Sequence, residues 1–184
     1  MAKLSTATIP VRRGPIFPYV KALVFSLGVK LALRPHTLLD VGCAKGEFLR
    51  LASFFGIDSF GVDVDEAAIL EVPEHLRKKC FVGDIVDLPF ETGQFNLVTS
   101  FAVLEHIPAG KSKAALEELL RVSRKNVLLQ ICVKDSFLER NRHYLLDPTH
   151  VNVKEGSWWA NLFSQMGVNY RELGPHLGVF LLTV

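Results

Sequence analysis

Carboxylates follow three short apolar runs in the first half of this chain, where the ends of parallel strands would collect them. The segment Leu39-Asp40-Val41-Gly42-Cys43-Ala44-Lys45-Gly46 places an acid ahead of two glycines and the start of a helix. Asp63 ends the second run and Asp84 follows the third. Glycines let a ligand approach the backbone, while acids repel phosphate and accept hydrogen bonds from hydroxyl and ammonium groups. The pattern therefore indicates a ligand that carries cationic and hydroxyl groups.

The spacing of these acids suggests which ligand groups they would hold. Asp63 lies 23 positions after Asp40, close to the spacing of an acid that accepts both hydroxyls of a ribose. Asp84 offers an acceptor for an exocyclic amine, and Ile85 beside it offers an apolar surface for a purine. A ribose, a purine and a cationic amino-acid group together describe S-adenosylmethionine. The loop lacks the GxGxxG order of dinucleotide-binding sites, which argues against a nicotinamide cofactor.

Apolar runs alternate with amphipathic helices along most of the chain, and they define the scaffold for these residues. We expect strands over 37–41, 59–63, 80–82, 95–100, 126–133, 168–172 and 177–184. We expect helices over 18–33, 47–55, 65–70 and 113–122, and a last helix that a capping box at 152–155 opens and Gly167 ends. This alternation predicts a doubly wound, mostly parallel α/β sheet, which binds ligands beyond the carboxyl ends of its strands.

Composition limits the class of protein. With 184 residues, 49% of them hydrophobic, the chain predicts one domain over 1–184, with an arm and helix at 1–35 and a core at 36–184. The apolar stretch 19–33 contains two lysines and is too short to span a membrane. A net charge of +2 argues against a nucleic-acid partner. Three cysteines without a CxxC pair exclude a disulfide framework and favour a reducing, cytoplasmic setting.

Four segments in order resemble the motifs of class I S-adenosylmethionine-dependent methyltransferases of the small-molecule, type 11-like kind. They are 39–46, Gly61-Val62-Asp63-Val64-Asp65, 83–90, and Phe95-Asn96-Leu97-Val98 through Leu104-Glu105-His106-Ile107. The resemblance covers roughly residues 36–172 and departs from the family at Ala44, where a glycine is frequent. It implies a seven-stranded Rossmann-like sheet with an antiparallel last strand. It also implies methyl transfer to an oxygen or nitrogen atom of a small metabolite or glycan precursor.

The resemblance assigns cofactor contacts position by position. The residues are Asp40, Gly42, Cys43, Gly46, Asp63, Val64, Asp84, Ile85, Ser100 and Phe101. Asp40 and Gly42 would lie at the methionyl end, where Ser100 and Phe101 also face the cofactor. Asp63 would hold the ribose, and Val64 would lie against the adenine.

Candidates for the acceptor side follow the fourth and fifth strands. We expect a general base at His106 or His150, since an imidazole is a neutral base near neutral pH. The polar insert 140–150 should wall the acceptor pocket, and the expected substrate contacts are His143, Tyr144, Asp147 and Trp158. The alternatives are purely structural: His106 closes a turn, and 147–149 is only a turn before the last helix. His143, Asp147 and His150 could form a metal set, but no strand-and-turn context supports it, and we predict no metal.

Two other functions stay open on the sequence alone. One is RNA methylation, which the near-neutral charge disfavours. The other is a catalytically silent, methyltransferase-like protein that serves as a partner subunit. The sequence does not predict an oligomeric state.

Overall fold

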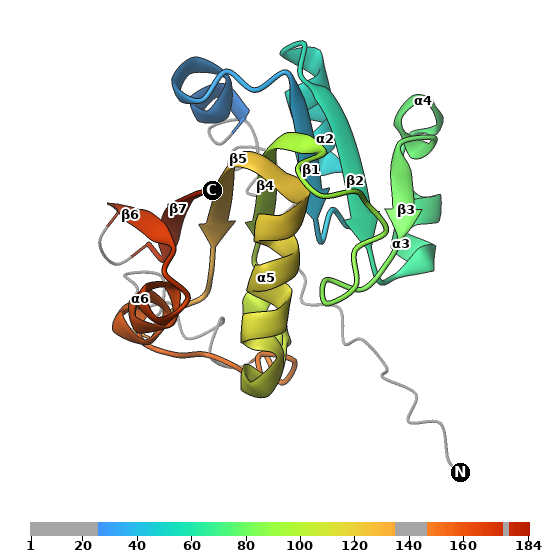
Figure 1. The fold of residues 1–184 in the computed structure, drawn as a ribbon. Coiled ribbons are helices and arrows are strands. Elements are labelled where there is room, and N and C mark those ends of the chain that lie inside the picture. The colour runs from blue at the N-terminus through green and yellow to red at the C-terminus, as the bar shows by residue number, and fades with distance from the viewer. Residues whose placement is uncertain (1–25, 135–146, 175–176) are drawn as a thin grey trace.

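A computed structural model of the chain describes residues 26–134, 147–174 and 177–184, and a seven-stranded sheet runs through its centre (Figure 1). The strands are β1 Thr37–Val41, β2 Asp58–Asp63, β3 Cys80–Val82, β4 Phe95–Phe101, β5 Ser123–Gln130, β6 Asn169–Gly174 and β7 Val179–Thr183. Their order is β3-β2-β1-β4-β5-β7-β6. The strands from β1 to β5 are parallel, and β7 is antiparallel to both β5 and β6. The predicted α/β class, strand number and antiparallel last strand are confirmed.

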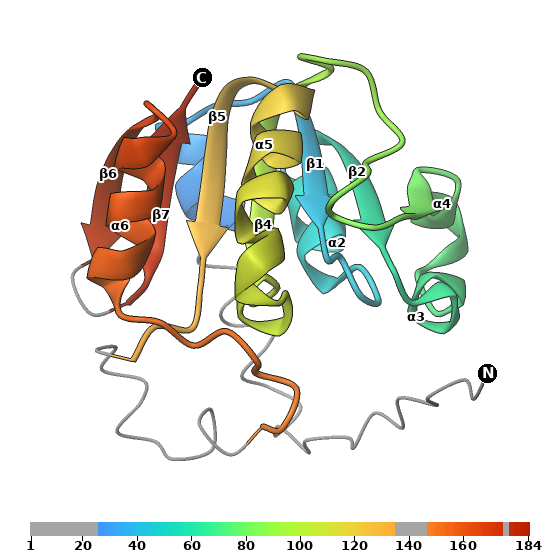
Figure 2. The same ribbon diagram turned by 60° about the horizontal axis from the view of Figure 1, so that its bottom comes forward.

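Helices cover both faces of this sheet (Figure 2). They are α2 Glu47–Phe54, α3 Glu66–Leu70, α4 Glu74–Arg77, α5 Ser112–Val122 and α6 Gly156–Gln165. Two 3-10 turns, η1 Leu104–His106 and η2 Ala109–Lys111, connect β4 to α5. Residues 26–32 are helical, and this helix ends before Pro35 as expected, while residues 18–25 of the predicted helix lie outside the described residues. No helix within the described residues combines the length and the apolar character that crossing a membrane requires.

Two apolar cores lie on opposite faces of the sheet, as the alternation of side chains along the strands requires. On β1, Leu39 and Val41 pack with α5 and α6, whereas Leu38 packs with α2 and the 26–32 segment. Trp159 and Phe163 of α6 have no exposed surface. Because both faces are covered, the central strands are rich in apolar residues. The polar side chains that could bind a ligand lie at the ends of these strands.

Three elements differ from the sequence-based expectation. β5 covers Ser123–Gln130 rather than 126–133, because it begins directly after α5 and its ladder ends before the apolar run does. The short helix α4 was not predicted. The capping box is wrong: α6 begins at Gly156, and Asn152 is buried and donates its amide to the Leu104 carbonyl (3.3 Å) and to Ser112 Oγ (2.9 Å).

Candidate functional site

The residues predicted to bind the cofactor gather at the carboxyl edge of the parallel strands. In the sheet, Val41 of β1 lies opposite Val62 of β2 and Ser100 of β4, so the loops that follow these strands are neighbours. β3 pairs with β2 at Asp63, which brings the loop after β3 to the same edge. The arrowheads of β1, β2 and β5 point toward this edge in Figure 2. The topology thus assembles the three acid-bearing loops.

The loop after β1 turns sharply at two glycines. Gly42 has a φ of +82°, and a Cβ atom there would lie 2.2 Å from Val103 Cγ2. Gly46 has a φ of +77° and directly precedes α2. Ala44 also has a positive φ of +46°, a conformation that costs an L-residue with a Cβ atom. The backbone therefore keeps the glycine-type turn that the family motif has, even though Ala44 is not a glycine.

Asp40 supplies a buried carboxyl group beneath that loop. Only 4% of the residue is exposed, and Thr99 Oγ1 donates a 2.8 Å hydrogen bond to its Oδ1. Burial raises the pKa of Asp40 to about 7 against the opposing effect of the Thr99 hydrogen bond, and the charges of Asp63 and Glu47 add to the rise. A carboxyl group in this state ionises readily when a cationic ligand arrives.

Asp63 holds the loop in place and keeps capacity for a ligand. Its Oδ2 accepts a 2.8 Å hydrogen bond from the Ala44 N–H, and its Oδ1 accepts a 2.9 Å bond from the Asp65 N–H. An ionised carboxylate has about four acceptor positions, so two remain for ribose hydroxyls. Val64 beside it is 74% exposed, an apolar surface at the place where an adenine ring is expected.

The loop after β3 carries the next predicted contacts. Asp84 Oδ1 accepts a 3.2 Å hydrogen bond from the Val86 N–H, which shapes the start of the loop. The Ile85 side chain is only 5% exposed and packs in the core on the α5 side of the sheet. If Ile85 contacts a ligand, we therefore expect its backbone, and not its side chain, to make the contact.

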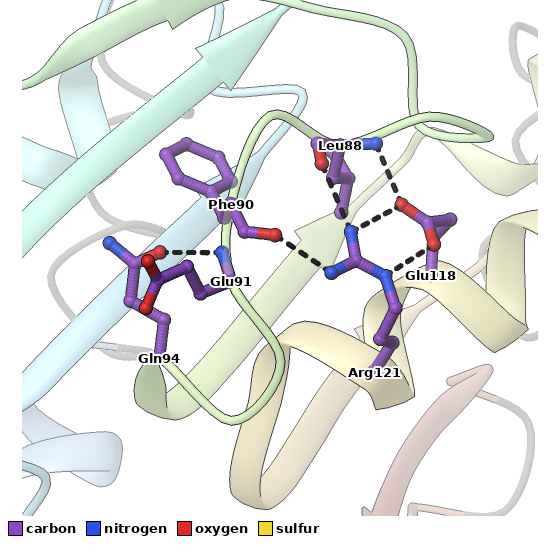
Figure 3. A network of polar contacts seen from close by, with 6 residues as sticks. All are labelled: Leu88, Phe90, Glu91, Gln94, Glu118 and Arg121. Atoms are coloured by element: carbon purple, nitrogen blue, oxygen red, sulfur yellow. Dashed lines mark hydrogen bonds and ion pairs between the residues drawn. The ribbon is translucent and has the colours of Figure 1, made fainter.

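A polar network fastens this loop to α5 (Figure 3). The Arg121 guanidinium donates to the carbonyls of Phe90 (2.7 Å) and Leu88 (3.0 Å) and pairs with Glu118. Glu118 Oε2 also accepts from the Leu88 N–H at 2.8 Å. Arg121 holds the pKa of Glu118 below its usual value. Residue spacing gives no sign of these contacts, because the backbone partners lie some thirty positions away.

We expect Arg121→Gln to loosen the loop that carries Asp84. The change removes donors to two carbonyls, which predicts a loss of about 1–3 kcal/mol in the free energy of unfolding. Urea denaturation measures this loss, and amide hydrogen exchange should rise in residues 84–94. Lys113→Gln is the matched control on the same helix, since its ion pair with Glu117 is exposed and should contribute less than about 1 kcal/mol. Equal stabilities of the two variants would contradict a role for the network.

A hollow of about 700 Å³ lies between this loop and strands β2 and β3. Its lining residues are Phe60, Phe81, Leu88, Pro89, Phe90, Glu91 and Gln94. None of these is a predicted cofactor or acceptor contact, so we assign the site to the carboxyl edge and not to this hollow.

At the carboxyl end of β4, Ser100 and Phe101 lie at the same edge of the sheet, beside the end of β1. The Ser100 hydroxyl is buried and has no hydrogen-bond partner among the described residues. Phe101 packs edge-on against Phe48 of α2, with ring centroids 5.0 Å apart. A buried hydroxyl without a partner, a glycine turn and a buried acid together fit the polar end of an amino-acid ligand.

The two histidines predicted to act on the acceptor meet in the structure. Their rings form an edge-on pair with centroids 4.7 Å apart, although His106 and His150 come from η1 and from the segment before α6. That segment, drawn in orange, runs past the carboxyl edge of the sheet in Figure 2. His106 also closes the turn before Pro108, as the structural alternative expects, and its role as a base stays a prediction.

Asp147 and Thr149 orient His106. The Thr149 hydroxyl donates a 2.5 Å hydrogen bond to Asp147 Oδ1, and His106 Nδ1 lies 3.0 Å from Thr149 Oγ1 and 3.2 Å from the Thr149 carbonyl. Hydrogen bonds from the Thr149 hydroxyl and N–H lower the pKa of Asp147. Asp147 is thus linked to His106 through Thr149, and its contact with a substrate stays a prediction.

Asn152 connects two segments of the site and does not cap α6. Besides its side-chain bonds to Leu104 and Ser112, its N–H donates to the Glu105 carbonyl at 3.0 Å. It therefore ties the segment that carries His150 to the turn that carries His106. A polar residue that is 1% exposed could not be recognised from spacing, because its partners lie 40 or more positions away.

Two of the remaining predicted residues, Trp158 and Cys43, pack against neighbouring side chains. Trp158 packs edge-on against Trp159 at the start of α6, and Lys154 Nζ lies 5.8 Å from its ring centroid. Cys43 is buried in the core on the α2 side, so its side chain is structural. His143 and Tyr144 lie outside the described residues.

Comparison with known proteins shows the family. A model of the family described as "Methyltransferase domain" matches residues 17–173, so this chain belongs to that family. A probable chloroplastic tocopherol O-methyltransferase from Oryza sativa is 34% identical over 129 residues, 66% of this chain and 33% of the relative. Ajmaline N-methyltransferase from Rauvolfia serpentina is 28% identical over 106 residues, 53% of this chain and 36% of the relative.

Solved structures share the fold. A SAM-dependent methyltransferase from Archaeoglobus fulgidus superposes with a TM-score of 0.72 at 15% identity, covering 92% of this chain and 100% of that one. The chain spans between 13% and 57% of the length of the curated relatives that it matches.

Proposed function

We propose that this chain is an S-adenosylmethionine-dependent methyltransferase that methylates an oxygen or nitrogen atom of a small metabolite or glycan precursor. The observation that carries the proposal is a juxtaposition: the glycine loop with its acids and the His106–His150 pair lie at one edge of the sheet. O- and N-methyltransferases among the relatives support both kinds of acceptor. Three free thiols in the described residues favour a reducing cytoplasmic setting, which we also propose.

The residues of the first three loops fit the cofactor. When bound, S-adenosylmethionine would supply a methyl group on its sulfonium, which the acceptor atom takes in line while S-adenosylhomocysteine leaves. Asp63 would accept from the ribose hydroxyls, Val64 would cover the adenine, and Asp84 would accept from the adenine amine. Ionised Asp40 and the Ser100 hydroxyl would face the ammonium and carboxylate groups of the methionyl end.

The histidine pair would take the proton of a hydroxyl or ammonium acceptor. The chain from Asp147 through Thr149 to His106 Nδ1 fixes this ring and leaves Nε2 as its basic nitrogen, the orienting logic of catalytic triads. Proton removal by a positioned base contributes roughly 10²–10⁴ to the rate. Turnover of a panel of hydroxyl and amine metabolites with radiolabelled S-adenosylmethionine tests the proposal. Methylation of a panel member supports it, and failure of the folded protein to bind the cofactor contradicts it.

The raised pKa of Asp40 predicts that the stability of the protein depends on pH. Its pKa is raised in the folded state, so between about pH 4 and pH 7 the folded protein holds a proton that the unfolded chain has lost. Stability conferred by this group therefore falls as the pH rises through that range and is lost above about pH 7. At about 1.4 kcal/mol for each pH unit, the loss is at most about 4 kcal/mol.

Asp40→Asn removes this titration. Without ligand, the unchanged protein should lose stability between pH 5 and pH 8, whereas the variant should not. The difference in the free energy of unfolding, variant minus unchanged protein, should therefore increase over this range in urea denaturation. Cofactor affinity of the unchanged protein should rise over pH 6 to 8, because binding needs the ionised acid. Stability differences that stay constant with pH would show that Asp40 does not titrate in this range.

A further inference from the structure

Two cysteines, Cys43 and Cys80, meet beside the cofactor loop, although the proposed reaction uses neither thiol. Cys43 follows Gly42 in the loop after β1, and Cys80 is the first residue of β3. In the reduced protein both side chains pack on the α2 face of the sheet. Strand β2 lies between β1 and β3, so the two side chains have to meet across β2.

Gly61 of β2 opens the gap in which the two thiols meet. It is the ladder partner of Cys80, and side chains at paired positions of neighbouring parallel strands project from the same face. A Cβ atom at Gly61 would lie 2.7 Å from Cys43 Sγ and 3.1 Å from Cys43 Cβ. The Cys43 side chain therefore occupies the space that a side chain at position 61 would fill, next to Cys80.

The two thiols differ in exposure and in acidity. Cys43 is only 4% exposed, whereas Cys80 is half-buried. A hydrogen bond between the thiols lowers the pKa of Cys80, and the same contact together with burial raises the pKa of Cys43. Their hydrogen bonds to the Ala44 and Leu76 carbonyls are long, at 3.9 Å and 3.6 Å. The thiolate, which is the reactive form, is therefore favoured on the more accessible cysteine.

We propose that Cys43 and Cys80 form a reversible disulfide in response to peroxide, and that this bond weakens cofactor binding. An accessible cysteine of lowered pKa beside a second thiol is the arrangement of redox-sensing cysteines. Disulfides that form in a reducing compartment are usually transient and regulatory, which agrees with the setting proposed for this chain.

The reaction balances with hydrogen peroxide as the oxidant. The Cys80 thiolate attacks one peroxide oxygen, the O–O bond breaks, and the hydroxide that leaves takes up a proton to become water. The Cys43 sulfur then attacks the sulfur of the Cys80 sulfenic acid, and a second water leaves with the Cys43 proton. Two thiols are oxidised and one peroxide is reduced to two water molecules. A dithiol reductant restores both thiols by exchange.

The bond would shift the backbone that shapes the cofactor site. A disulfide requires the sulfur atoms to lie about 2.05 Å apart, closer than two thiols in hydrogen-bond contact, so Cys43 has to move toward β3. The neighbouring Ala44 N–H donates to Asp63 Oδ2, the carboxylate assigned to the ribose. Gly42 and Ala44 both have a positive φ, so the loop has few other conformations that absorb the shift.

Oxidation should therefore weaken S-adenosylhomocysteine binding by at least about tenfold, the effect of losing one hydrogen bond to a charged group. This consequence rests on the proposed function, whereas formation of the disulfide does not.

The first test starts from the reduced full chain and measures disulfide formation by mass spectrometry. Mild treatment with hydrogen peroxide should remove two of the three thiols, and peptide mapping should identify a Cys43–Cys80 link. Cys132→Ser, which changes another buried cysteine, is the matched control and should keep this link.

Dimedone, which traps sulfenic acids, tests the order of the two steps. It should label Cys80 in Cys43→Ser, and it should not label Cys43 in Cys80→Ser. If Cys43→Ser fails to fold, dimedone present during oxidation of the unchanged chain gives the same readout at Cys80. Labelling of Cys43 in place of Cys80 would contradict the assignment of Cys80 as the cysteine that reacts with peroxide.

Calorimetric titration with S-adenosylhomocysteine before and after oxidation measures the coupling. Affinity should fall by the stated factor in the unchanged protein and in Cys132→Ser, and dithiothreitol should restore it. Peroxide should not change the affinity of Cys80→Ser. No disulfide, a disulfide through Cys132, or normal affinity after the Cys43–Cys80 link has formed would overturn the inference and leave the proposed function standing. If the reduced, folded protein binds no S-adenosylhomocysteine, the proposed function and the coupling both fail, and mass spectrometry still decides the disulfide.

Discussion

His106→Gln and His150→Gln should each lower turnover of the methyl acceptor by roughly 100-fold or more, the contribution expected of a positioned proton-removing group. The reason is their meeting at the carboxyl edge, where His106 is oriented through Thr149 and Asp147. The measurement is a single-turnover assay with an acceptor identified from the metabolite panel. Neither change removes a predicted cofactor contact, so affinity for S-adenosylhomocysteine should stay nearly the same.

The control for this pair is His75→Gln, which changes an exposed histidine on α4. It should turn over acceptor at the rate of the unchanged protein. If both site variants also keep that rate while remaining folded, the acceptor is activated elsewhere and the histidine pair is only structural.

Asp63→Ala should weaken cofactor binding by about 1.5–3 kcal/mol, the range for hydrogen bonds to a charged group. In dissociation constants this is roughly a 10- to 150-fold increase. The carboxylate has two effects: it offers acceptors to the ribose, and it holds the Ala44 and Asp65 N–H groups that shape the glycine loop. Calorimetric titration with S-adenosylhomocysteine measures the change.

Asp58→Ala is the matched control at the opposite end of the same strand. Asp58 pairs with Lys79 on the surface, so its loss should leave the dissociation constant within about twofold. A normal dissociation constant for a folded Asp63→Ala would remove Asp63 from the cofactor site.

The sheet could be predicted from the sequence because its strands and loops carry local signals. The alternation of apolar residues placed β1 at 37–41, as observed, and the acid and glycines after it gave the loop. The end of β5 could not be predicted, since the apolar run 131–133 is buried by contacts that follow the last ladder pair. Asn152 matched the pattern of a helix cap because asparagine serves both at helix N-termini and, as here, at buried positions where its side chain hydrogen-bonds to distant segments.

The acceptor side was predicted less completely than the cofactor side. The cofactor loops follow strands that neighbour one another in the sheet, so their meeting follows from topology alone. His106 and His150 were each identified as candidates, but their contact depends on Asn152 and Thr149, 40 or more positions from their partners.

The most direct test of the account is calorimetric binding of S-adenosylhomocysteine to the unchanged protein, with NAD⁺ titrated in parallel. The glycine loop headed by Asp40, together with Asp63, predicts one-to-one binding of S-adenosylhomocysteine and no heat of binding for NAD⁺. Absence of S-adenosylhomocysteine binding by folded protein, or binding of NAD⁺ in its place, would contradict the assignment of this edge of the sheet as a methyltransferase cofactor site.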